Sequence, residues 1–236
     1  MKIIICLFLL LTTNAFADHI RLINVVGEAS KSYEPDIAKI NLSIWGKGEN
    51  AKTAQSLNQG QYEQLKKTLD DHKVLPPDIQ TIGYELNPDY LYDNKTSTNK
   101  IVGYIATQTI RVTIKKVKTV GKFLDDLIID FKNLKAGTNV QSISWDLEKR
   151  DEIEKTLLIE AVSLAEEQAQ VLAKAAHVKV KNLYQLTPQG SASPIPMYQN
   201  EGMMLKSAGG ARAQSTALFT GEVKVKAEVV AAYEIE

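Results

Sequence analysis

The chain has 236 residues, with 28 basic and 28 acidic side chains, so its formal net charge is zero. This balance argues against a nucleic-acid-binding protein, because phosphate binding requires a basic excess on some face. A hydrophobic content of 44% and a charged content of 24% exclude a disordered or fibrous chain.

The N-terminal residues 1–17 predict a secretory signal peptide. Lys2 gives a basic start, Ile3 to Leu11 form an apolar run, and residues 15–17 (AFA) form a small-x-small cleavage site. Cleavage after Ala17 would remove Cys6, the only cysteine of the chain. The exported protein would then depend on packing or assembly rather than on disulfides. No later apolar stretch reaches the about 20 residues of a membrane span, so we expect no transmembrane helix in the mature chain.

Residues 18–236 are predicted to form a single α+β domain. Alternating apolar residues predict strands, apolar residues three and four apart predict helices, and Asn50 is a suitable N-cap. The first predicted strand stops at Gly27-Glu28, and a long hairpin loop is predicted over residues 87–100. The order strand, helix, strand, strand, helix, strand predicts a ferredoxin-like split βαβ arrangement. The predicted elements are strands at 20–26, 37–45, 79–86, 101–114 and 138–147, with helices from 50 to before Pro76 and at 119–131.

A long helix and C-terminal strands are predicted to follow. The helix covers residues 149–177, and its wide, alanine-rich apolar arc could be covered on two sides. Strands are predicted at 178–186 and 217–235, the second suited to pair with an early strand. Between them lies a Pro/Gly/Met-rich loop at 188–216. The apolar arc consists of one stripe at Ile153, Leu157, Ala161, Leu164 and Val171 and a second at Leu158, Val162, Ala165, Ala169, Leu172 and Ala176.

Three groups of short motifs resemble the SIMPL-domain family of exported bacterial proteins. They are VGEA and PDIA at 26–29 and 35–38, DIQT and LNPDYLY at 78–81 and 86–92, and IVGY at 101–104. The resemblance extends from about Asn24 to the C-terminus. It implies an α+β fold, residence in the periplasm or association with the outer membrane, homo-oligomerisation, and a role in envelope or oxidative-stress physiology. It implies no catalytic residues.

Four tyrosines on or beside the predicted hairpin form the first candidate site: Tyr84, Tyr90, Tyr92 and Tyr104. One interpretation is structural, with the rings packing as cross-strand pairs. The other is functional, with the rings lining a ligand groove or an interface. Met203 and Met204, in the loop at 188–216, are a second candidate, either as a hydrophobic anchor or as an oxidisable or copper-binding pair.

Residues with recognisable reaction chemistry are absent from the sequence. His19, His72 and His177 are scattered without metal-ligand spacing, and the mature chain has no thiolate. His19 next to a free N-terminus could bind copper, but a solvated tail is the simpler interpretation. No Gly-x-Ser-x-Gly motif or phosphate-binding loop occurs. We therefore expect no enzymatic activity, no cofactor and no resident metal.

The sequence thus predicts a non-enzymatic periplasmic protein that assembles with copies of itself and acts in envelope integrity or oxidative-stress tolerance. Two alternatives stay open. One is a small-molecule-binding or enzymatic module that uses the tyrosine hairpin and the loop at 188–216. The other is a stress protein acting through methionine or metal chemistry.

Overall fold

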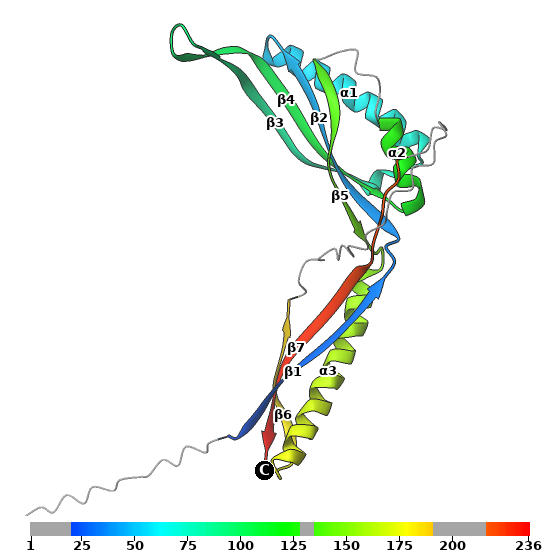
Figure 1. Ribbon diagram of the computed structural model, residues 1–236, viewed down its shortest axis with the longest axis vertical. Coiled ribbons are helices and arrows are strands. Elements are labelled where there is room, and N and C mark those ends of the chain that lie inside the picture. The colour runs from blue at the N-terminus through cyan, green and yellow to red at the C-terminus, as the bar shows by residue number, and fades with distance from the viewer. Residues whose placement is uncertain (1–19, 128–134, 191–215) are drawn as a thin grey trace, which may run out of the picture. The chain divides into compact units, whose positions relative to one another are not determined.

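The computed structural model describes residues 20–127, 135–190 and 216–236 (Figure 1). Helices and antiparallel strands confirm the predicted α+β class. The chain forms two compact units. The central unit comprises residues 30–157 and 191–226, and the terminal unit comprises residues 1–29, 158–190 and 227–236. The predicted signal peptide lies outside the described residues, and the assignment of 18–236 to one domain stays a prediction.

The central unit is built on a four-stranded sheet with the order β3-β4-β2-β5. Every neighbouring pair is antiparallel, and two helices pack with the sheet around one core. Ile40, Leu42 and Ile44, predicted to alternate toward the core, are fully buried in the second strand. The elements are β2 (Ile37–Gly48), α1 (Ala51–Asp71), β3 (Ile79–Asp93), β4 (Thr98–Ile114), α2 (Val120–Leu127) and β5 (Ala136–Asp146), with short 3-10 turns at Pro76–Asp78 and Val117–Thr119.

Helix α1 begins where the sequence predicts and lies close to β2. The Asn50 side chain accepts a hydrogen bond from the Thr53 backbone N–H at 2.9 Å, as an N-cap does. Gly46 allows the close approach, since a Cβ there would lie 2.5 Å from the Asn58 nitrogen. The buried Asn58 amide donates to the carbonyl oxygens of Ile44 at 2.9 Å and Ala106 at 3.3 Å. These bonds satisfy a polar side chain that would otherwise destabilise the core.

The hairpin loop predicted over residues 87–100 is wrong. Strand β3 continues to Asp93, β4 begins at Thr98, and the turn is confined to residues 94–97. Pro88 and the polar composition of the segment suggested a loop. A proline is nevertheless tolerated in an edge strand, and β3 is the outermost strand of the sheet. The hairpin is therefore a long two-stranded ribbon.

The terminal unit combines a three-stranded sheet of order β1-β7-β6 with helix α3. The C-terminal strand thus pairs with the first strand, as predicted. The first strand does not stop at Gly27-Glu28, since it continues through Gly27 to Tyr33. Pro188 and Gln189, predicted as loop, belong to the sixth strand. The elements are β1 (Leu22–Tyr33), α3 (Arg150–Ala175), β6 (Val180–Gln189) and β7 (Val223–Ile235).

Helix α3 packs through a ridge of alanines that combines members of both predicted stripes, while other members of the stripes are exposed. The ridge residues, four apart in sequence, share one helix face. Leu164, Val171 and Leu172, predicted in the apolar stripes, are 38–61% exposed. The helix lies so near β1 that a Cβ on Gly27 would collide with the Ala161 carbonyl oxygen, which leaves no room for larger side chains. The buried ridge is Ala161, Ala165, Ala169 and Ala173.

Candidate functional site

The tyrosines predicted as a site come together on the β3–β4 hairpin. Strand residues two apart lie on the same face, so Tyr84, Tyr90 and Tyr92 line one side of β3. They are 49%, 58% and 55% exposed. The strand register places Tyr90 opposite Ile101, and Pro88 opposite the half-buried Tyr104. We call this surface the tyrosine stripe: Tyr84, Leu86, Tyr90, Tyr92, Ile101 and Tyr104.

The tyrosine stripe lies on the face of the sheet that carries α1, yet α1 does not cover it. Tyr104 shares its face of β4 with Ala106 and Ile110, which are fully buried. Helix α1 packs over β2, β4 and β5, while Tyr84 and Leu86 on β3 stay 49% and 41% exposed. The stripe is therefore an apolar continuation of the core surface without a cover among the described residues.

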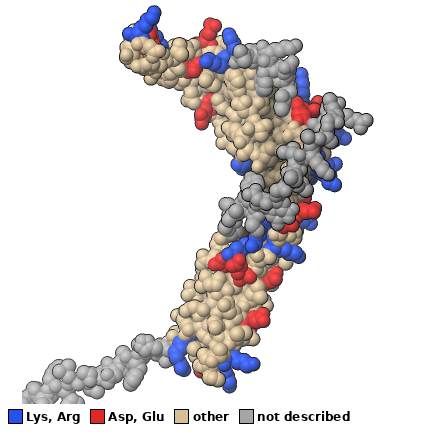
Figure 2. All heavy atoms as spheres, viewed as in Figure 1, with Lys and Arg blue, Asp and Glu red and all other residues tan. Residues whose placement is uncertain are grey.

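The outer half of the hairpin pairs only with itself. Strand β2 follows β4 as far as the pair Gly48 and Tyr104, and residues 88–93 beyond it pair only with residues 98–104 (Figure 1). Charged side chains occur at the turn end (Figure 2), where Lys100 forms an ion pair with Asp93 at 2.6 Å. The hydrogen bond from Lys100 lowers the pKa of Asp93 below its usual value. The ribbon continues the four-stranded sheet, and the ion pair between Lys47 and Asp89 ties its base to β2.

Met203 and Met204, the other predicted site residues, lie outside the described residues. Their role stays a prediction.

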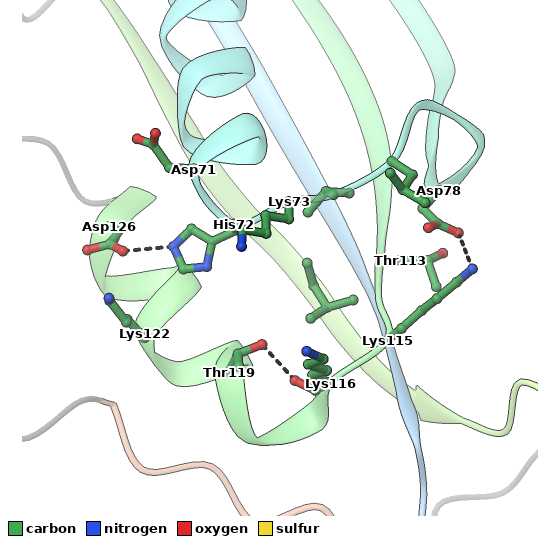
Figure 3. Close-up of a pocket in the computed structure, with 13 residues that line it drawn as sticks. Asp71, His72, Lys73, Asp78, Thr113, Lys115, Lys116, Thr119, Lys122 and Asp126 are labelled. Atoms are coloured by element: carbon green, nitrogen blue, oxygen red, sulfur yellow. Dashed lines mark hydrogen bonds and ion pairs between the residues drawn. The ribbon is translucent and has the colours of Figure 1, made fainter.

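A pocket that the sequence did not predict lies at the C-terminal end of α1 (Figure 3). It encloses about 400 Å³ between the end of α1, the end of β4 and the beginning of α2. Figure 3 shows His72 and Asp126 on one side, Asp78 and Lys115 on the other, and Lys116 with Thr119 between them. In the sequence the residues of this pocket are only scattered lysines, because nothing there indicates that the ends of three elements meet.

Polar contacts of His72 and Lys115 define two walls of this pocket. His72 Nε2 lies 2.7 Å from Asp126 Oδ2, and the His72 ring meets Phe123 edge-on with centroids 5.2 Å apart. Lys115 Nζ lies 3.3 Å from Asp78 Oδ1 and 3.4 Å from Glu148 Oε1. Its hydrogen bond to Asp78, followed by that to Glu148, raises the pKa of Lys115.

A buried carboxylate organises the junction between β5 and α3. Asp146 accepts hydrogen bonds from Lys39 and Arg150, both at 2.6 Å. Burial by itself would raise the pKa of Asp146, but the bonds from Lys39 and Arg150 outweigh burial and lower it. Arg150 also lies 3.4 Å from Glu154. Each of the four groups has a partner of opposite charge within the cluster, so the cluster is structural.

Neither a metal site nor a membrane helix is found in the described parts of the chain. No group of three or more His, Cys, Asp or Glu side chains there is placed to hold a metal ion. Within residues 20–127, 135–190 and 216–236, no helix is both long and apolar enough to cross a membrane.

Fold and surface together define an α+β protein whose main exposed feature is an aromatic ribbon. Residues 23–233 match the SIMPL family, described as a "Protein of unknown function (DUF541)", and the chain belongs to this family. The 26 kDa periplasmic immunogenic protein of Brucella abortus (strain S19) is 27% identical over 225 residues, which cover 91% of this chain and 84% of the relative. The uncharacterized protein YggE of Escherichia coli (strain K12) is 29% identical over 192 residues, covering 80% and 74%.

Proposed function

We propose that this SIMPL-family protein is a non-enzymatic protein of the bacterial periplasm that assembles with copies of itself through the tyrosine stripe. Its role would be in envelope integrity or oxidative-stress tolerance. The predicted signal peptide and the name of the Brucella relative support the periplasm. The observation that carries the assembly proposal is the row of exposed tyrosines on a hairpin whose outer residues, 90–93 and 98–101, form strand pairs only with one another.

Aromatic side chains favour an interface over a solvent-exposed surface. Tyrosine combines a large apolar body with a hydroxyl that stays hydrogen-bonded, and it is enriched at the centres of protein interfaces. Tyr84, Tyr90 and Tyr92 are each about half exposed in the single chain. Burial of these rings against a second copy would remove apolar area from water, at about 25 cal/mol per Å².

The contact we propose uses the face of the ribbon rather than the free edge of β3. Pro88 lies in the middle of that edge strand and has no N–H. A proline in such a strand hinders the addition of another strand, which protects the edge from uncontrolled pairing. The tyrosine face has no such interruption. Two copies can therefore stack their stripes without extending the sheet.

The test compares two double variants of the mature protein by sedimentation velocity. We expect Tyr90→Ser with Tyr92→Ser to shift the wild-type assembly to monomer. The matched control is Ile159→Ser with Tyr184→Ser, which removes side chains 74% and 55% exposed in the terminal unit. The control should keep the wild-type assembly state.

Two results would contradict parts of the proposal. A wild-type protein that stays monomeric at micromolar concentrations would exclude self-assembly. Loss of assembly in the control alone would place the interface on the terminal unit and exclude the stripe. Circular dichroism would establish that both variants keep the wild-type fold.

A further inference from the structure

The pocket at the end of α1 carries more lysines than aspartates. Its lining includes Lys73, Lys115, Lys116 and Lys122 against Asp71, Asp78 and Asp126. The positive excess holds whichever protonation state His72 has. Ion pairs with nearby carboxylates engage only Lys115, which leaves the other three lysines available to a ligand.

Lys73, Lys116 and Lys122 form no ion pair with any carboxylate of the described chain. Lys73 follows α1, Lys116 follows β4, and Lys122 lies in the first turn of α2, so the fold brings them together from three separate elements. All three lysines are exposed, so their ammonium groups are open to an anion from the solvent.

Lys73 lies beside the pocket because of the backbone conformation in which α1 ends. Its φ is 55°, in the left-handed region, and its N–H donates to the Asp70 carbonyl oxygen at 3.0 Å. The following Val74 N–H donates to the Leu69 carbonyl oxygen at 2.9 Å. These bonds close the helix end in the manner usually given to glycine. Lysine suits this backbone conformation less well than glycine, but it places a cation beside the pocket.

We propose that this pocket binds a phosphate group, either free or as the headgroup of a lipid. Lysine ammonium groups bind phosphate as point charges without demanding one planar geometry. The Thr119 side chain also lines the space, and its hydroxyl donates to the Lys116 carbonyl oxygen at 2.7 Å, which ties Thr119 to the Lys116 backbone. Leu75, 58% exposed at the pocket, provides an apolar neighbour for the remainder of a larger ligand. This inference is independent of the self-assembly proposed above.

The test titrates the mature protein with inorganic phosphate at constant pH and ionic strength, followed by amide NMR shifts and calorimetry. We expect saturable binding, with shifts centred on Lys73, Lys116, Thr119 and Lys122. The variant Lys73→Gln, Lys116→Gln, Lys122→Gln should lose at least about tenfold in affinity, as expected when charge-assisted hydrogen bonds are removed.

A second triple variant controls for the change in net charge. Lys52→Gln, Lys155→Gln and Lys174→Gln removes three exposed lysines that lie outside the pocket lining. It should bind phosphate like the wild type. An equal loss in both triple variants, or no saturable response of the wild type to phosphate, would overturn the proposal. Thermal melts of both variants would show that each is folded.

Vesicle flotation distinguishes the two sources of phosphate. Phosphatidylcholine vesicles containing phosphatidic acid present a phosphate monoester, and vesicles of phosphatidylcholine alone are the reference. If the protein binds the vesicles with phosphatidic acid and inorganic phosphate competes with this binding, the ligand is a lipid headgroup. A phosphate response without vesicle binding supports a soluble phosphate compound. Vesicle binding that is insensitive to both phosphate and the pocket variant contradicts the site.

Discussion

Asp146 is a buried charged residue of the central unit. It is 6% exposed and is held by Lys39 and Arg150. Removing one member of a buried charged cluster leaves the others without compensation, and this costs more than the cluster contributes when complete. The junction between β5 and α3 thus depends on one carboxylate.

The lowered pKa of Asp146 predicts a loss of stability in acid. A group with a folded-state pKa below its unfolded value binds fewer protons when folded, so its contribution is present above the ordinary aspartate pKa of about 3.9 and is lost as pH falls through the folded value. We expect Asp146→Asn to lower the free energy of unfolding by about 2 kcal/mol at neutral pH. The difference from the wild type should shrink at pH about 3.

Urea unfolding at both pH values would measure this effect. Asp71→Asn is the control, since Asp71 is exposed and forms no ion pair with other described residues. A difference between Asp146→Asn and the wild type that does not change with pH would contradict the proposed role of the Asp146 charge.

At the scale of elements, β1 and α3 are in close contact in the terminal unit. Gly27 brings the backbone of β1 against the alanine ridge of the helix, where no Cβ fits. At this point helix and strand pack through backbone and methyl groups alone. The interface therefore tolerates no increase in volume.

Gly27→Ala is expected to lower the free energy of unfolding by about 1–3 kcal/mol, because the added methyl group forces α3 away from β1. Gly60→Ala is the matched control. Gly60 lies in the interior of α1 with open space where the methyl group of an alanine would lie, and alanine should stabilise a helix there by up to about 1 kcal/mol. Denaturant midpoints measure both variants. Equal stability of Gly27→Ala and the wild type would disprove the close-packing account.

The elements differ in how far the sequence could predict them. Two features were predicted correctly because each depends on near neighbours in sequence. They are the alternation of Ile40, Leu42 and Ile44 in β2 and the Asn50 cap of α1. Pro88 misled the prediction because its tolerance depends on the edge position of β3, which is a tertiary property. The tyrosines were identified as a candidate site. The lysine pocket was missed because its residues meet only in the folded chain.

At the scale of the whole molecule, the proposed physiological role predicts a phenotype. A strain lacking the gene should be more sensitive to peroxide or to envelope stress, and the wild-type gene should restore resistance. If assembly is required, the gene with Tyr90→Ser and Tyr92→Ser should not restore it, while the gene with Ile159→Ser and Tyr184→Ser should. Survival in peroxide dilution series measures the outcome. Full restoration by the stripe variant would separate assembly from stress tolerance.

The outer ribbon also bears on how this chain can change in evolution. Residues 88–103 make their strand pairs almost entirely with one another, and the turn at 94–97 lies at their end. Substitutions there touch few buried groups, so selection for folding constrains them weakly. Positions 90 and 92 would then be constrained by the proposed assembly more than by the fold. The ribbon can diversify at little cost to the fold, and a lineage can alter its partners while keeping its core.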